Sequence, residues 1–238
     1  MRSPYLSVII PAYNEEKIIS NTIDEVYSFL KKNNWNSEII IGDDGSSDRT
    51  VLIVKKKIKQ YKNIKLVEGK INKGKGAILR KCFSVAKGDI QLFIDSDLTI
   101  DINLISIAIK YIEDGYDISI ASKYLPNSNI SYPLSRKIFS KGFAFITRIL
   151  LNTKIRDHQC GLKCFRKEAI RKILPHLKIN GFLIDTEMLV IAQNKNFRIK
   201  EFPATVKPEY SRGSKVKIFK DSLIMGKGIL RLRKRFKK

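Results

Sequence analysis

The stretch IQLFIDSD at residues 90–97 joins a mostly apolar run of five residues to the carboxylates of Asp95 and Asp97. A short run rich in apolar and β-branched residues is typical of a buried strand. Residues two apart in extended chain point to the same side, so both carboxylates can reach one hard cation. We therefore predict a site for Mg²⁺ or Mn²⁺ at Asp95 and Asp97, where the cation also takes diphosphate oxygens and neutralises charge on a leaving group.

The rest of the first half alternates short strands with helices. Runs rich in Ile and Val lie at residues 6–10, 38–42, 64–67 and 118–121, and amphipathic segments lie at residues 15–32, 47–61, 75–86 and 102–113. Such alternation predicts an α/β fold with a mostly parallel central sheet flanked by helices. Because ligands of these sheets bind beyond the carboxyl ends of the strands, polar clusters at those ends form the candidate site.

The second half has a different pattern. Residues 125–133 are a loop rich in Asn, Ser and Pro, residues 134–151 a basic amphipathic helix or pair of helices, and residues 162–165 a strand. Helices are predicted at residues 167–174 and 183–193, and a strand pair broken at Pro203 at residues 197–206. We expect a catalytic domain over residues 1–215 and a basic amphipathic C-terminal helix over residues 216–238.

The net charge is +23, from 46 basic and 23 acidic residues, which predicts an anionic partner. A nucleic-acid-binding module is a remote alternative, because the sequence has no RNP-like motif, zinc finger or helix-turn-helix pattern and that function leaves Asp95 and Asp97 unexplained. Residues 216–238 interleave nine Lys and Arg residues with apolar ones, which favours contact with an anionic membrane surface. The other interpretation is a solubilising basic face on an ordinary docked helix. Residues 134–151 are a second candidate for membrane contact.

Three cysteines, Cys82, Cys160 and Cys164, show no framework spacing, which favours a reducing compartment. Cys160 and Cys164 resemble half a zinc site, but no second pair follows, so packing is the favoured role. We find no signal-peptide pattern and no run of ~20 apolar residues. We expect a cytoplasmic protein, peripheral on the cytoplasmic face of a membrane.

Two further clusters follow predicted strands: PAYNE at residues 11–15 and DDGSSD at residues 43–48. Carboxylates there are unfavourable unless they bind a ligand or cap a helix. Capping explains Ser47 but not Asp43 and Asp44 together, and these can accept bonds from a base N–H or a ribose hydroxyl. The segment NKGKG at residues 72–76 is either a phosphate cradle or a solvated turn.

Four motifs occur in order: VIIPAYNE at residues 8–15, DDGSSDRT at 43–50, NKGKG at 72–76 and DSD at 95–97. In this order they resemble family 2 glycosyltransferases, which have the GT-A (Rossmann-like) fold. The resemblance implies a nucleotide-sugar donor. It also assigns Pro11, Tyr13, Glu15, Asp44 and Lys75 to the nucleotide site, to which Asp95 and Ser96 also belong, and Asp95 and Asp97 to the metal.

The second half narrows the resemblance. DHQCGLKCF at residues 157–165 is similar to the DxQCGFKLF segment of dolichyl-phosphate glucosyl- and mannosyltransferases, and FLIDTEML at residues 182–189 is similar to their FDVELL segment. The resemblance implies inverting transfer of a hexose to a polyprenyl phosphate. Because these segments favour the glucosyl type, we expect UDP-glucose or UDP-N-acetylglucosamine rather than GDP-mannose as donor.

The acceptor motif departs from the family, because the usual GSRY is ASKY at residues 121–124. Lys123 keeps the charge of the family's acceptor-phosphate arginine without its bidentate fork. Arg136 matches a second such arginine, and Arg212 is a further candidate. A phosphomonoester acceptor needs no strong base, because its second pKa is ~6.

The sequence leaves more than one role open for Asp185. It is a general base if the acceptor is a hydroxyl of a glycan or other molecule, which is the alternative function. Otherwise it positions the donor sugar or orients neighbouring Arg or Lys side chains.

Overall fold

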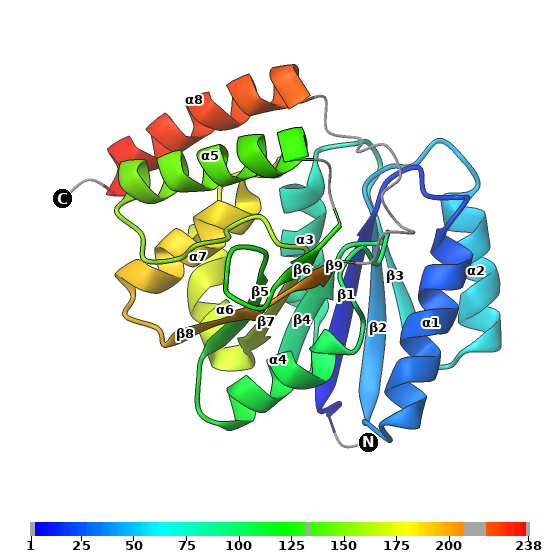
Figure 1. The fold of residues 1–238 in the computed structure, drawn as a ribbon. Helices are drawn as coiled ribbons and strands as arrows, with labels where there is room; N and C mark the ends of the chain where they lie inside the picture. Colours follow the sequence, from blue (N-terminus) through cyan, green and yellow to red (C-terminus); the bar gives the residue numbers. More distant parts are fainter. Residues whose placement is uncertain (1–2, 132–133, 207–217, 237–238) are drawn as a thin grey trace.

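Seven strands form one sheet in the computed structural model, which describes residues 3–131, 134–206 and 218–236 (Figure 1). The strand order is β3-β2-β1-β4-β7-β5-β8. The bounds are β1 Leu6–Ala12, β2 Ser37–Asp43, β3 Ile64–Glu68, β4 Ile90–Ile94, β5 Ile118–Ser122, β7 Leu162–Arg166 and β8 Ile199–Pro203. Two short strands, β6 Asn129–Ile130 and β9 Thr205–Val206, pair in a second sheet.

The main sheet is parallel except for β7, which runs antiparallel between β4 and β5. The predicted mostly parallel α/β fold is thereby confirmed. The strand order reverses between β1 and β4, and ligands of open α/β sheets bind beside such a reversal. The antiparallel direction of β7 places its first residue, Leu162, beside Ile94 at the end of β4. Residues 157–161 therefore lie against the DSD segment.

Helices cover both faces of the sheet (Figure 1). Helices α1 Ile19–Lys32, α2 Thr50–Gln60 and α4 Leu104–Glu113 share one apolar core, and α3 Lys75–Val85, α6 Lys167–Ile173 and α7 Ile184–Asn194 share the other. Successive strand residues alternate between these cores: Val8 and Ile10 enter the first and Ile9 enters the second. Burial on both faces explains why the strands are continuous apolar runs rather than alternating ones.

Two helices begin later than predicted because the loops before them are fixed by side-chain hydrogen bonds. Helix α1 begins at Ile19 rather than residue 15, since the Glu15 amide donates to Thr50 Oγ1 and Asn14 adopts a positive φ of 52°. Helix α2 begins at Thr50 rather than residue 47. Asp48 Oδ1, not Ser47, accepts the Thr50 amide, so the predicted capping role of Ser47 is wrong.

Residues 134–151 form a single helix, α5 (Leu134–Leu151), and α8 (Ile218–Phe236) lies beside it (Figure 1). Ile229 and Leu232 of α8 are buried against Leu183, the residue before α7. Within the described residues, no helix is both long and apolar enough to cross a membrane.

Candidate active site

The DSD segment forms a turn rather than a continuation of β4. The strand ends at Ile94, and the Leu98 amide donates to the Asp95 carbonyl at 3.1 Å, with Leu98 at a positive φ of 44°. The extended-chain argument for Asp95 and Asp97 is therefore wrong in its geometry. The Ser96 carbonyl is fixed by Thr22 Oγ1 at 2.6 Å, and the Asp95 amide by the Gly161 carbonyl at 3.0 Å.

The two carboxylates nevertheless interact. Burial, reinforced by the negative charge of Asp95, raises the pKa of the Asp97 carboxyl above its ordinary value. A cation beside both groups would relieve this repulsion, so these residues fit the implied metal. The described residues contain no group of three or more His, Cys, Asp or Glu side chains that could hold a metal. Two carboxylates with diphosphate oxygens and water completing the shell is the usual arrangement for Mg²⁺.

A buried chain of charges connects this segment to α7. Lys75 Nζ lies 2.8 Å from Asp95 Oδ1 and 3.2 Å from Asp185 Oδ2, while Lys163 Nζ lies 2.7 Å from Asp185 Oδ1. Burial opposes ionisation of Asp185, but Lys163 and Lys75 outweigh it and hold the pKa of this carboxyl below its ordinary value. Both ammonium groups also lie over the Phe93 ring, at 4.9 and 5.2 Å from its centroid. Asp185 is therefore an ionised, doubly paired group.

Lys163 is a candidate site residue that the sequence did not single out. Its side chain is fully buried in β7, and its ammonium also donates to the Cys160 carbonyl at 2.7 Å. The signal in the sequence is a lysine between Leu162 and Cys164 in the apolar part of a strand, since lysine is almost never fully buried without a partner.

The strand ends of β1 and β2 lie side by side, with Ala12 paired to Asp43. Asp43 Oδ2 accepts the amides of Gly45 and Ser46, at 3.1 and 3.0 Å. Within the described residues, its Oδ1 atom is buried with no hydrogen-bond partner, which fits an acceptor kept for a ligand N–H or hydroxyl.

Pro11 lies in β1, and Tyr13 and Glu15 follow that strand. Tyr13 is 39% exposed beside these strand ends, where its ring can contact a ligand. The Asn14 amide donates to Ser46 Oγ at 2.9 Å, which ties this loop to the segment after Asp43.

The glycine-rich loop before α3 is packed against protein rather than open. Asp44 accepts the amides of Lys73 and Gly74, at 3.0 and 2.6 Å, and the Gly76 amide donates to the Asn180 carbonyl at 2.6 Å. A Cβ atom on Gly76 would lie 2.3 Å from the Ile179 carbonyl oxygen. These amides are engaged by protein groups and are not directed at a ligand as a phosphate cradle requires, while Asn72 and Lys73 remain exposed to solvent. The loop leads into α3, whose first residue, Lys75, contacts Asp95.

The segment before β7 links this site to the predicted acceptor residue Lys123. Asp157 Oδ2 accepts the Lys123 amide at 2.9 Å and lies 3.5 Å from the Lys123 ammonium. Gln159 Nε2 donates to Thr186 Oγ1, next to Asp185, at 2.9 Å. Cys160, like the other two cysteines, is buried and unpaired with another cysteine, as packing residues are. Residues 157–161 thus contact the DSD segment, α7 and Lys123.

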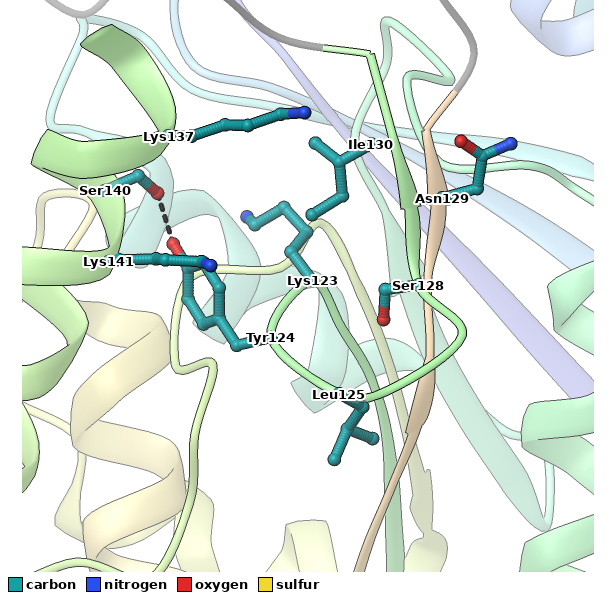
Figure 2. A pocket seen from close by; sticks show the side chains of 9 residues that line it. All are labelled: Lys123, Tyr124, Leu125, Ser128, Asn129, Ile130, Lys137, Ser140 and Lys141. Atoms are coloured by element: carbon teal, nitrogen blue, oxygen red, sulfur yellow. Dashed lines mark hydrogen bonds between the residues drawn. The ribbon is translucent and has the colours of Figure 1, made fainter. Parts of the chain in front are cut away.

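Lys123 lines a pocket of about 400 Å³ between the loop after β5 and helix α5. Figure 2 shows the Lys137 and Lys141 side chains leaving α5 toward that loop, where Tyr124 hydrogen-bonds Ser140. The pocket is lined by Lys123, Tyr124, Leu125, Ser128, Asn129, Ile130, Lys137, Ser140 and Lys141. Arg136 belongs to α5, but its side chain lies outside the described residues, as does Arg212.

Comparison with known proteins gives the family. The sequence profile described as glycosyl transferase family 2 matches residues 7–174. The chain is 33% identical to glycosyltransferase AglD of Haloferax volcanii over 95% of this chain and 36% of that protein. It is 34% identical to a dolichyl-phosphate beta-glucosyltransferase of Dictyostelium discoideum over 98% of this chain and 75% of that protein. The Saccharomyces cerevisiae protein of the same name is 32% identical over 96% and 74%.

Solved structures show the same fold. Mannosyl-3-phosphoglycerate synthase from Rubrobacter xylanophilus aligns with a TM-score of 0.71 at 16% identity, covering 96% of this chain and 73% of that one. Glucosyl-3-phosphoglycerate synthase from Mycobacterium tuberculosis, solved with Mn²⁺ and UDP, aligns with a TM-score of 0.65 at 17% identity, covering 96% and 78%. The profile match over most of the chain and the relatives above 30% identity lead to one conclusion: the chain belongs to glycosyl transferase family 2 and has the GT-A fold.

Proposed function

We propose that this protein is an inverting, metal-dependent hexosyltransferase that moves a sugar from a nucleotide-sugar to a polyprenyl (dolichyl) phosphate. The proposal rests on the presence of two regions of opposite charge. One holds the carboxylates of Asp95 and Asp97, and the other is the pocket lined by Lys123, Lys137 and Lys141. The names of the relatives, dolichyl-phosphate beta-glucosyltransferases, support the same donor and acceptor classes. They favour a glucosyl donor over a mannosyl donor, and we propose UDP-glucose or a related UDP-sugar rather than GDP-mannose.

On the donor side, Asp95 and Asp97 would hold Mg²⁺ or Mn²⁺, which neutralises charge on the leaving nucleoside diphosphate. Solved structural relatives contain Mn²⁺ with UDP or UDP-glucose, which supports a divalent cation here. Lys75 contributes a positive charge at Asp95, where it can also meet a diphosphate oxygen. Pro11, Tyr13, Glu15, Asp43 and Asp44 surround the proposed nucleotide.

On the acceptor side, a phosphate oxygen attacks the anomeric carbon while the bond from that carbon to the diphosphate oxygen breaks. The phosphate is already largely dianionic near neutral pH, with a second pKa of ~6, so no proton has to be removed. The site then needs cations more than it needs a base. Lys123, Lys137 and Lys141 are such cations, and Arg136 and Arg212 are two more by resemblance.

The place of the reaction follows from the acceptor, whose isoprenoid chain resides in a membrane. We propose that the protein works as a peripheral protein on the cytoplasmic face of an anionic membrane. Three cysteines that form no disulfide support a reducing compartment, and the net charge of +23 supports an anionic surface.

The test is one assay of purified protein with Mg²⁺ or Mn²⁺, a panel of nucleotide-sugars, and polyprenyl phosphate against the matching polyprenol. We expect product only with the phosphate and a divalent cation. Asp97→Asn should lower turnover at least about a hundredfold and abolish metal-dependent nucleotide binding. Full activity of this variant, or equal transfer to the polyprenol, contradicts the proposal.

The alternative acceptor is a hydroxyl group, with Asp185 as general base. A base for a hydroxyl works best with a pKa near the operating pH, but Lys163 and Lys75 hold the pKa of Asp185 low and occupy both its oxygens. We therefore propose a positioning role. Asp185→Asn should be tolerated better than Asp97→Asn, whereas collapse of turnover with intact donor binding would favour the hydroxyl acceptor.

A further inference from the structure

Helix α5 exposes an apolar face. The exposed side chains Phe145, Ile146 and Ile149 are 61%, 53% and 63% accessible. With Gly142 they follow the spacing of one helical stripe, i, i+3, i+4 and i+7, and we call these four residues the α5 stripe. Lys141, which lines the pocket, lies one turn before Phe145 on the same side of the helix.

This face is the reverse of what a docked surface helix presents, because such helices turn charged or polar residues outward. In α5 the polar Thr147 is buried, and the Arg148 Nε atom is buried without a hydrogen-bond partner in the described residues. Another side of the helix is also apolar, since Phe143, Leu150 and Leu151 pack toward α8 and Leu183. Helix α5 therefore has apolar surface toward the protein and away from it.

Helix α8 supports α5 from behind. Its apolar residues Ile229 and Leu232 are buried in the protein, so they are not free to enter a lipid layer as the sequence pattern suggested. Arg235 fixes the end of the helix, with Nη1 2.6 Å from Glu187 Oε1 and Nη2 2.5 Å from the His176 carbonyl. The exposed side of α8 carries Lys227, Leu230, Arg231, Arg233 and Lys234.

We infer that the α5 stripe, rather than the buried Ile229 and Leu232 of α8, is the surface that enters the interfacial region of an anionic phospholipid bilayer. An apolar stripe flanked by exposed basic residues is the composition that binds the boundary between headgroups and acyl chains. Lys141 on α5 and the basic residues on α8 supply charge complementary to anionic headgroups. A second protein copy would offer the same positive charge and would be repelled.

The inference deepens the proposed function and rests on it for its purpose. Because the stripe continues directly from Lys141, insertion of Phe145 and Ile149 brings the mouth of the pocket to the headgroup level. An acceptor phosphate can then reach Lys123, Lys137 and Lys141 while its isoprenoid chain remains in the bilayer.

The experiment is flotation of full-length protein with vesicles of phosphatidylcholine alone or with about a third phosphatidylglycerol. The test variant is Phe145→Ser/Ile146→Ser/Ile149→Ser. The matched control is Leu52→Ser/Val85→Ser/Ile107→Ser, which removes three comparably exposed apolar side chains from α2, α3 and α4. We expect the test variant to lose at least about tenfold in vesicle partitioning and the control to bind as wild type does.

Measurements of turnover with two acceptors distinguish a failure of this inference from a failure of the proposed function. With a ten-carbon, water-soluble isoprenyl phosphate the test variant should match wild type, and with long-chain acceptor in vesicles it should fall in parallel with binding. Unchanged flotation of the test variant overturns the inference, as does a wild-type dimer that the substitution dissociates without any vesicle binding. If flotation depends on the α5 stripe but wild type transfers sugar to neither acceptor, the membrane-binding surface is supported and the proposed function is wrong.

Discussion

The donor side and the acceptor side of this protein are built in different ways. On the donor side, charged side chains from α3, β7 and α7 are buried and paired with one another, as in the chain from Lys75 through Asp185 to Lys163. In the pocket beside α5, Lys137 and Lys141 extend from a surface helix toward a loop (Figure 2). The donor side is therefore part of the folded core, whereas the acceptor side is a surface that can vary without altering the sheet.

The arrangement of charged side chains also differs between the donor side and the acceptor side. On the donor side opposite charges are paired, and the like-charged Asp95 and Asp97 are the pair that a cation would relieve. On the acceptor side like charges converge: three lysines line one pocket, which suits an anionic substrate. Substitutions on the donor side should therefore affect folding and the metal site, and those of Lys137 and Lys141 on the acceptor side should affect substrate affinity alone.

The largest effect that this comparison predicts is on stability, from Lys163→Met. The substitution leaves Asp185 buried with one ammonium partner instead of two and leaves the Cys160 carbonyl without its donor. Removing one partner of a buried ion pair lowers the free energy of unfolding by about 3–5 kcal/mol. Equilibrium unfolding in urea measures the change.

The control for this prediction is Lys55→Met, at an ion pair with Glu68 of 3.0 Å between Nζ and Oε1 in which both side chains are about half exposed. Surface pairs contribute about 0–1 kcal/mol, so this variant should unfold nearly as wild type does. Equal losses in the two variants would mean that the buried chain of charges has no special role in holding the donor side together.

The sequence predicted the fold well because periodicity and strand-end clusters are local signals. The parallel sheet and the place of Asp95 and Asp97 followed from them. The pairing of Lys163 with Asp185, 22 residues apart, could not be predicted, because it depends on β7 running antiparallel beside β4. The turn after Ile94 and the packing of the glycine loop on Asn180 are likewise tertiary contacts that leave no periodic pattern.

A smaller effect is expected on metal binding from Gly161→Ala. A Cβ atom at residue 161 would lie 2.3 Å from Asp95 Oδ2 and 2.9 Å from its Cγ, so the carboxylate must move. Because small displacements of supporting groups weaken a metal site, Mn²⁺-dependent UDP affinity should fall about tenfold. Titration calorimetry with and without Mn²⁺ gives the two affinities. Gly142→Ala is the control, since nothing lies within 4 Å of its added Cβ.

The smallest effect concerns the acceptor alone. Lys123→Gln removes one of the three lysine charges in the pocket, and loss of one charge-assisted hydrogen bond should raise the KM for the acceptor phosphate about tenfold. Nucleotide affinity should not change, since Lys123 Nζ lies 3.5 Å from both Asp157 Oδ2 and the Gln159 carbonyl, in the segment before β7. Lys123→Arg keeps the charge and adds a bidentate fork, so it should keep or lower that KM.

Lys110→Gln, on the exposed side of α4, controls for the change in net charge. If Lys123→Gln weakens nucleotide binding as much as acceptor binding, the two sides are not separate and the comparison between a core donor side and a surface acceptor side is wrong.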